Sequence, residues 1–244
     1  MTGHLPDPDI QCGGCGVQVY CSWACRANDR QHDLECPFIA NKGVLPLRDE
    51  VRVMIRAILK LQKEQCSNVS LLKGGPGDEV PTQPNRRKFS DLLSHKENFL
   101  ENEERRQDII LVYNEVEDFL GSLVPSFDEF VEILGRLYIN GFEICTDKME
   151  TYGWGVYLGP SIMDHSCQPS ACVSFSGYRL TVTCLRHVTS LTDLFISYCD
   201  TSLPTKLRRE KLKRNYFFSC ICCKCSHTSR GVSIQYKNRS RGKK

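Results

Sequence analysis

The 244-residue sequence predicts an α+β protein with a cysteine-rich metal site near each end. Five cysteines lie between positions 12 and 36 and four between 220 and 225. A helical apolar period occupies most of the chain up to residue 140. Short β-type runs begin at residue 152. Helices followed by strands, rather than alternating with them, are typical of the α+β class.

The composition is that of a globular protein large enough to bury a core, with 41% apolar and 25% charged residues. No run of 18 apolar residues occurs, and the first ten residues lack the pattern of a signal peptide. We therefore expect an intracellular chain without membrane contact. Thiols stay reduced in that compartment, so the 15 cysteines indicate metal binding rather than disulfides.

The helical part opens at residues 48–62, where one face carries a core-type stripe. The stripe consists of Val51, Met54, Ile55, Ile58 and Leu61. Residues 67–88 mix Gly, Pro and polar residues and predict an exposed loop. Residues 88–123 predict two helices, and residues 126–140 a third that opens with Ser126 and Glu129 in capping-box spacing.

Strands are predicted at 154–158, 171–176, 178–185 and 194–198, with Ser176 and Gly177 as a hairpin turn. A helix is then predicted within residues 203–218.

The first cysteine cluster reads C-x2-C-x5-C-x3-C-x6-H-x3-C. Zn²⁺ prefers four thiolate or imidazole ligands in a tetrahedron, and Cys12, Cys15, His32 and Cys36 make one full set. Cys21 and Cys25 remain as half of another set. This pattern resembles the latter three-quarters of a MYND zinc finger, in which two interleaved zincs are bound. We therefore expect one well-formed site and one incomplete site.

The second cluster supplies Cys220, Cys222 and Cys225, with Cys223 as a spare. Three cysteines do not complete a structural zinc site, so a fourth ligand must come from elsewhere. Cys167, in the stretch "MDHSCQPSACVSF", is our candidate.

Three motifs, "DHSCQPS", "LFISY" and "NYFFSCICCKCS", resemble the C-terminal half of a SET domain with its post-SET zinc motif. Together with the finger, the chain resembles the SET and MYND domain (SMYD) family of protein-lysine methyltransferases over most of residues 12–226. The resemblance implies a partial SET-type β fold with a helical insertion. The implied parts are a partial finger (1–40), helical linker and insertion (41–150), the C-terminal half of the SET core (151–200), a post-SET motif (201–226) and a basic tail (227–244).

The resemblance also implies roles for single residues. Tyr198 matches the catalytic tyrosine, which orients a neutral lysine amine toward the methyl donor. Candidate contacts to S-adenosylmethionine are His165, Asp164, Asn140 and His95. The aromatic positions of the lysine channel are Phe142, Tyr216 and Phe218.

Taken without the resemblance, His95 is as well explained as an exposed helical histidine, and Asn140 as the end of a helix before Gly141.

The sequence departs from the family pattern at several points. Asp164 replaces the usual asparagine, and an ionised carboxylate accepts hydrogen bonds but cannot donate them. Thr192 and Asp193 stand where the family has a Gly-Glu-Glu turn. Only eleven residues precede Cys12, so we expect the Gly-rich cofactor turn and its strands to be missing, together with the helical C-terminal domain.

The leading hypothesis is an S-adenosylmethionine-dependent, zinc-containing lysine methyltransferase that acts on a histone or another protein in the nucleus and cytoplasm. The alternative is a non-enzymatic zinc module whose finger binds a peptide partner. A thiol hydrolase using His165 and Cys167 lacks an evident oxyanion donor. The basic tail predicts a solvated end, with nucleic-acid binding as the minority interpretation.

Overall fold

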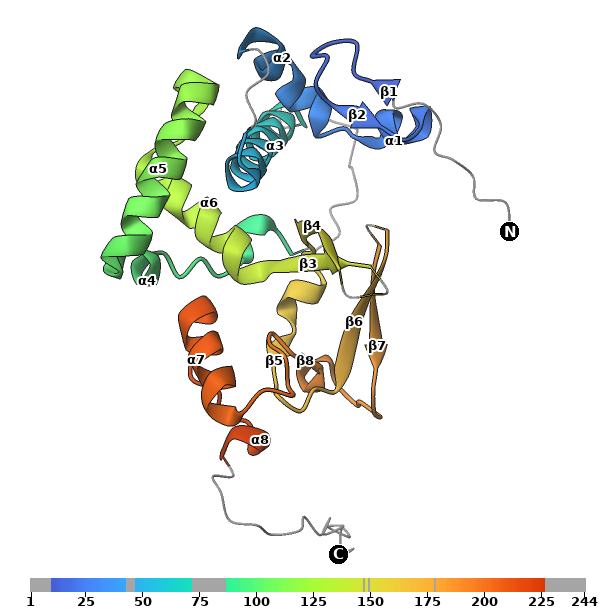
Figure 1. The fold of residues 1–244 in the computed structure, drawn as a ribbon, viewed down its shortest axis with the longest axis vertical. Coiled ribbons are helices and arrows are strands. Elements are labelled where there is room, and N and C mark those ends of the chain that lie inside the picture. Colours follow the sequence, from blue (N-terminus) through green and yellow to red (C-terminus); the bar gives the residue numbers. More distant parts are fainter. Residues whose placement is uncertain are drawn as a thin grey trace, which may run out of the picture. The chain divides into compact units, whose positions relative to one another are not determined.

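The computed structural model describes residues 10–42, 47–71, 87–146, 148, 150–177 and 179–226 (Figure 1). The chain forms two compact units, Met1–Phe142 and Glu143–Lys244, and each is described by itself. Helices and strands occur in both units, so the predicted mixed helix and strand composition is confirmed. The predicted basic tail at 227–244 lies outside the described residues.

The first unit opens with two short antiparallel strands and two helices. These are β1 (Ile10–Gln11), β2 (Val19–Tyr20), α1 (Trp23–Asn28) and α2 (His32–Lys42). Ser22 caps α1, because its side-chain oxygen accepts a hydrogen bond from the Cys25 amide at 3.1 Å.

The rest of the first unit is helical. Its elements are α3 (Asp49–Leu71), η1 (Phe89–Asp91), α4 (Lys96–Glu101), α5 (Glu103–Leu120), η2 (Gly121–Leu123) and α6 (Phe127–Asn140). Helix α3 extends to Leu71, so the loop predicted at 67–88 began too early. Residues 72–86 of that loop lie outside the described residues.

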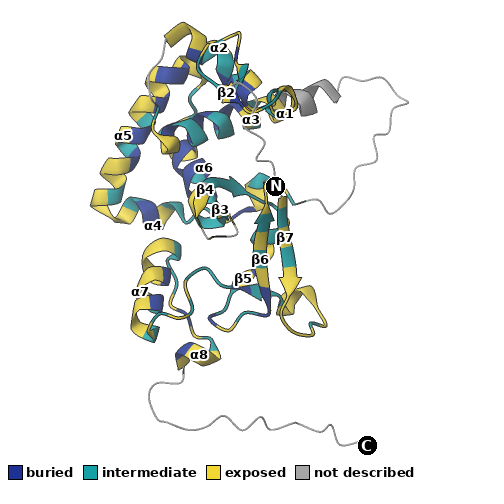
Figure 2. Ribbon diagram, turned by 45° about the vertical axis from the view of Figure 1, so that its right-hand side comes forward, coloured by how far each residue is buried: buried dark blue, intermediate teal, exposed yellow. Residues whose placement is uncertain are grey.

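Apolar side chains at helical spacing form the core where α3, α5 and α6 pack together. Val51, Met54, Ile55 and Ile58 of the predicted α3 stripe are buried. Leu61 is only partly buried, and Leu59 takes the next core position instead. Figure 2 shows the same alternation of buried and exposed residues along α5.

Side-chain caps set where the helices begin. Asn102 accepts a hydrogen bond from the Arg105 amide at 2.9 Å at the start of α5. Ser126 accepts one from the Glu129 amide at 3.3 Å at the start of α6, as its spacing predicted. His95 was predicted to be helical, which is wrong. It precedes α4 as the N-cap with φ of 51°, a left-handed conformation that interrupts the helical pattern.

Gly135 of α6 packs against the main chain that leads into α4, and a Cβ there would overlap the Ser94 carbonyl oxygen. Replacing a glycine inside a helix by alanine ordinarily stabilises by about 1 kcal/mol. Because backbone must shift here, we expect Gly135→Ala to destabilise the protein by about 1–3 kcal/mol in denaturant unfolding. Gly159→Ala is the control, since that position has ordinary helical dihedrals and open space around it. A Gly135→Ala variant that gains stability would contradict the contact.

The second unit contains short, separately paired strands. Strand β3 (Gly141–Cys145) pairs with β4 (Thr151–Val156), β5 (Asp164–His165) with β8 (Phe195–Ile196), and β6 (Ala171–Ser176) with β7 (Arg179–Cys184). Strand β3 was not predicted, because β-type runs were expected only from residue 152. Gly141, which follows Asn140 at the end of α6, is extended and belongs to β3.

The β6–β7 hairpin is antiparallel, whereas β5 and β8 are parallel. Ser176 was predicted to lie in the turn, but it pairs with Arg179 as the last residue of β6. Gly177 lies in the connection with φ of 59°, a conformation that glycine adopts without a Cβ penalty.

Ser170 joins these two strand pairs and is fully buried. Its hydroxyl donates to the Asp193 carbonyl at 2.6 Å and accepts from the Phe195 amide at 2.8 Å. Its own carbonyl accepts from the Leu185 amide at 2.8 Å. Because these bonds satisfy the buried polar atoms, Ser170 fixes β8 beside the start of β6.

The described part of the chain ends with α7 (Thr205–Tyr216) and α8 (Cys223–Ser226). The single-turn helices η3 (Pro160–Ile162) and η4 (Leu191–Asp193) lie in the preceding connections, and Thr192 and Asp193 belong to η4. None of the helices in the described ranges is long and apolar enough to cross a membrane.

Candidate metal centres and active site

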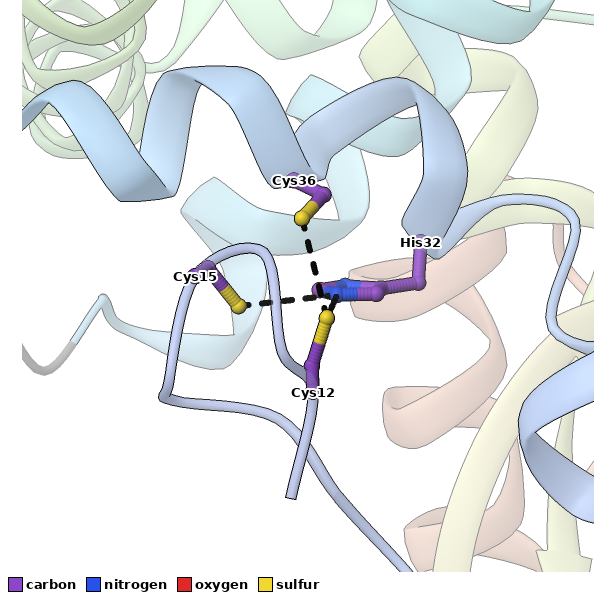
Figure 3. Close-up of side chains that lie close together, drawn as sticks. All are labelled: Cys12, Cys15, His32 and Cys36. Atoms are coloured by element: carbon purple, nitrogen blue, oxygen red, sulfur yellow. Dashed lines mark hydrogen bonds between the residues drawn. The ribbon is translucent and has the colours of Figure 1, made fainter. Parts of the chain in front are cut away.

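The first candidate metal centre gathers four side chains of the finger, and Figure 3 shows them converging. Cys12 and Cys15 come from the loop after β1, and His32 and Cys36 from successive turns of α2. The ligand atoms of all four residues lie within 4.8 Å of one another.

Their spacing fits a tetrahedral zinc ion. Bonds of about 2.3 Å to sulfur and about 2.0 Å to nitrogen place tetrahedral ligand atoms about 3.5–3.8 Å apart. The Cys12 and Cys36 sulfurs are 3.7 Å apart. The Nε2 atom of His32 lies 3.3 Å from the Cys12 sulfur and 3.6 Å from the Cys15 sulfur. These four residues can therefore hold a metal ion; we call them the finger centre.

A buried carboxylate supports the finger centre from behind. Glu35 is 1% exposed, and its Oε1 atom lies 3.1 Å from Nδ1 of His32. Arg52 and Arg56, one turn apart on α3, each place an Nη2 atom 2.6 Å from the same oxygen. Burial would raise the pKa of Glu35, but the hydrogen bonds from Arg56 and Arg52 lower that pKa to about 2.

Cys21 and Cys25 form a separate pair, with their sulfurs 3.2 Å apart at the start of α1. Both side chains are exposed. Among the described residues, no metal-binding group of three or more includes either of them. Two thiolates do not complete a zinc site, so the expectation that this half-set is incomplete stays a prediction.

The second candidate metal centre consists of Cys167, Cys220, Cys222 and Cys225, whose sulfurs lie within 4.8 Å of one another. The Cys167 sulfur is 3.9 Å from that of Cys220 and 3.5 Å from that of Cys225. Leu212 of α7 packs against this cluster from within the unit. We call these four cysteines the four-cysteine centre, and their spacing also fits zinc.

Each centre contains one thiol whose environment favours the thiolate. Backbone hydrogen bonding at Cys15 lowers the pKa of Cys12 to about 6. Burial opposes ionisation of Cys222, but hydrogen bonding from Cys220 lowers its pKa to about 7. Since metals bind the thiolate form, the lowered pKa of each of these two thiols favours metal binding.

His165 and Tyr198 form a junction beside the four-cysteine centre. The Tyr198 amide donates to Nδ1 of His165 at 3.0 Å, and Nε2 of that histidine lies 3.3 Å from the Cys167 sulfur. The Tyr198 hydroxyl donates to the Met163 carbonyl at 2.5 Å. Burial lowers the pKa of His165 to about 4, and the charge of Arg208 adds to this effect. The ring is therefore neutral near pH 7.

Aromatic rings surround this junction. The Tyr198 ring centre lies 4.9 Å from that of Tyr216 and 6.5 Å from that of Phe218. The His165 ring lies 5.8 Å from Phe218. Faces of aromatic rings tolerate a positively charged group, so this group of rings offers an environment for a cation.

The other predicted site residues are not part of the ring contacts described above. Asp164 is the first residue of β5, and its side chain is exposed. His95 and Asn140 belong to the first unit, and Phe142 of β3 is the last residue of that unit. The Asn140 amide donates to the Leu93 and Arg136 carbonyls, at 2.9 and 2.8 Å. Their predicted roles stay predictions.

Sequence reasoning missed Glu35 and Arg208, two buried charged residues that contact the candidate ligands. A signal for each was present. Glu35 lies three residues after His32 on the same helix, which puts the two side chains on one face. Arg208 lies four residues before the buried Leu212, and so falls on the buried stripe of α7.

No protein-family model matches the chain. Curated relatives do match. The chain is 28% identical over 223 residues to the histone-lysine N-methyltransferase SMYD3 of Mus musculus, covering 88% of this chain and 48% of the relative. It is 29% identical over 222 residues to the N-lysine methyltransferase SMYD2-A of Danio rerio, covering 90% and 48%. It is 26% identical over 235 residues to the histone-lysine N-methyltransferase ASHR1 of Arabidopsis thaliana, covering 92% and 45%. The chain thus spans about half the length of the curated relatives it matches.

Proposed function

Because this chain is related to the SMYD family of lysine methyltransferases, we propose that it takes part in S-adenosylmethionine-dependent methylation of lysine side chains in proteins. The names of the relatives favour this enzymatic function over the alternative of a non-enzymatic zinc module. The substrate is then a protein with an accessible lysine, either a histone or another protein.

The observation that carries the proposal is the junction of His165 and Tyr198 within its aromatic group. The aromatic rings that contact Tyr198 and the Met163 carbonyl place electron-rich groups near the Tyr198 side chain. Such groups fit a sulfonium cation and a lysine side chain. S-Adenosylmethionine, when bound, would supply a methyl group on a positively charged sulfur.

Tyr198 has the chemistry to orient the attacking amine. Lysine must lose a proton before its nitrogen can attack, and its ordinary pKa is about 10.4. Removing water from the ammonium group disfavours its charged form, because the attraction to aromatic faces replaces only part of the lost hydration. The Tyr198 hydroxyl donates to the Met163 carbonyl, and a hydroxyl oxygen is also the kind of group that accepts an N–H from a neutral amine. A held amine directs its lone pair along one line of attack.

We propose further that zinc fills both the finger centre and the four-cysteine centre as a structural ion. Asp164, His165, Asn140 and His95 stay the candidate cofactor contacts, and Phe142, Tyr216 and Phe218 the candidate channel residues. The finger is proposed to bind a peptide partner, and the nucleus and cytoplasm stay the predicted locations.

Titration calorimetry of S-adenosylmethionine into the purified, zinc-loaded chain tests the function. Micromolar binding of the cofactor would support the proposed function. A separate assay should then detect transfer of a radiolabelled methyl group to core histones or to another protein mixture. Absence of heat at millimolar cofactor would overturn the proposal for this chain.

Tyr198→Phe is expected to lower the rate of methyl transfer roughly 100-fold, because it removes the hydroxyl that is proposed to orient the amine. The affinity for S-adenosylmethionine should change little, since the ring remains. Tyr138→Phe, on an exposed position of α6, serves as the control and should keep the wild-type rate. Equal rates of methyl transfer for the two variants would show that the Tyr198 hydroxyl takes no part in the reaction.

A further inference from the structure

The two histidines nearest the metal centres have opposite tautomers. Nδ1 of His32 faces the Glu35 carboxylate at 3.1 Å, and a carboxylate oxygen accepts a hydrogen bond. The proton of His32 therefore lies on Nδ1. This leaves the lone pair of Nε2 directed at the sulfurs of Cys12 and Cys15, as a metal ligand requires.

His165 has the reverse arrangement. Its Nδ1 atom receives the Tyr198 amide hydrogen at 3.0 Å, and a backbone N–H cannot accept in return. The neutral ring must then carry its proton on Nε2, which lies 3.3 Å from the Cys167 sulfur. His165 thus donates an N–H to a candidate ligand instead of being one itself.

This tautomer decides between two interpretations of the region. His165, Cys167 and Cys199 also place their ligand atoms within 4.8 Å of one another, which suggests another metal site. A protonated Nε2 has no lone pair to give to a metal. The group is therefore better explained as a hydrogen-bonded shell around Cys167.

Arg208 supplies a second donor to the same sulfur. It is 3% exposed, with Nε 3.2 Å from the Cys167 sulfur and Nη2 3.5 Å from the Cys225 sulfur. The guanidinium is anchored by donating to the Leu203 carbonyl at 2.5 Å and to the Thr205 hydroxyl at 3.1 Å.

The positive charge of Arg208 can compensate the negative charge of the four-cysteine centre. Four thiolates around one Zn²⁺ carry a net double negative charge, which is unfavourable in a buried position unless it is compensated. Arg208 brings one positive charge into that position, and hydrogen bonds to charged groups are the strong ones.

We propose that Arg208 and His165 are positioning residues of the four-cysteine centre, which donate hydrogen bonds to the Cys167 sulfur and link it to the Tyr198 main chain. This inference rests on the proposed zinc in that centre. Through His165, the ligand Cys167 and the candidate catalytic residue Tyr198 then share one hydrogen-bonded unit.

Metal affinity, measured by chelator competition on the full chain, tests the inference. Outer-shell partners of metal ligands typically change affinity roughly 10- to 100-fold. We expect that loss for the four-cysteine centre in Arg208→Met, which keeps an apolar stem but has no donor or charge. Arg208→Lys keeps the charge and should recover part of the affinity.

The histidine has a similar pair of variants. His165→Gln can place an amide N–H where Nε2 stood and should stay near the wild-type affinity. His165→Asn is too short to reach the sulfur and should lose affinity. Arg214→Met is the control, since Arg214 is exposed and donates to Asn215.

Replacing zinc with cobalt gives a second measurement, the absorption spectrum of the metal centre, which responds to hydrogen bonds at the sulfur rather than to packing. A thiolate that loses its donors becomes easier to oxidise, so the sulfur-to-cobalt charge-transfer band of Arg208→Met should shift to lower energy. Glu35→Gln, which touches only the finger centre, should leave the four-cysteine component unchanged.

The outcomes separate the inference from the proposed zinc centre on which it rests. A wild-type chain without metal at Cys167 would overturn the proposed zinc centre and the inference with it. A wild-type chain that binds this metal, together with variants of equal affinity and unchanged cobalt spectra, would overturn the inference alone. An Arg208→Lys variant that loses as much affinity as Arg208→Met would show that a positive charge alone does not explain the residue, and would overturn the argument from charge.

Discussion

Replacing Glu35 with alanine is expected to destabilise the first unit by about 3 kcal/mol, measured by denaturant unfolding of the zinc-loaded chain at pH 7. The carboxylate is the shared acceptor of three groups, namely His32, Arg52 and Arg56. Removing one partner of a buried ion pair typically costs about 3–5 kcal/mol. The lower value is expected because the arginine side chains are 34% and 25% exposed and can recover some hydration.

A surface pair provides the matched control. Glu115 pairs with Arg48, and both side chains are nearly half exposed. Exposed ion pairs contribute less than about 1 kcal/mol, so Glu115→Ala should lower stability by no more than that. Equal losses for Glu35→Ala and Glu115→Ala would mean that burial does not strengthen the Glu35 contacts.

The acid dependence provides a second check on Glu35. Its folded pKa of about 2 lies below the ordinary value of 4.5, so its ionised form stabilises the fold at every pH above 4.5. That contribution is lost as the pH falls from 4.5 to 2. The stability difference between the wild type and Glu35→Gln should therefore shrink over this interval, while remaining constant between pH 5 and 7.

The local elements of the first unit were largely predictable from sequence. The stripe from Val51 to Ile58 and the cap at Ser126 each depend on residues within one or two helical turns. The same holds for His32 and Cys36, which are separated by one turn of α2. Where a structure depends on neighbours in sequence, spacing carries most of the information.

The remaining features depend on partners distant in sequence. Glu35 is explained only once α3 brings two arginines to it, and Arg208 only once Cys167 lies beside α7. His95 shows the opposite failure, because it lies within a helical pattern but adopts a left-handed conformation before α4. Neither a tautomer nor a cap of this kind follows from residue type, since each depends on which atom the fold places opposite the side chain.

Replacing Cys167 with serine is expected to remove the metal of the four-cysteine centre, lowering bound zinc from about two ions to about one per chain. Cys167 is 2% exposed, and without it only Cys220, Cys222 and Cys225 remain, which do not complete a tetrahedral site. Native mass spectrometry of the full chain counts the ions directly.

The loss should also loosen the main chain around the centre. Structural zinc contributes about 10–16 kcal/mol of binding free energy in zinc-finger peptides, as much as the whole stability of a typical domain. Leu212 packs on the same cluster, so α7 and α8 are expected to lose protection together in hydrogen exchange. The helices of the first unit should keep theirs, because the finger centre retains all four of its side chains.

Cys223 provides the control within the same motif. It lies next to Cys222 in sequence, but its side chain is exposed and its sulfur contacts Gln168 at 2.8 Å. Cys223→Ser should keep both zinc ions, and iodoacetamide should label Cys223 but not Cys167 in the zinc-loaded wild type. Loss of zinc in Cys223→Ser with full retention in Cys167→Ser would reverse the assignment of the fourth ligand. It would also remove the hydrogen-bonded link from the metal to Tyr198. That link passes through His165, whose Nε2 atom lies 3.3 Å from the Cys167 sulfur.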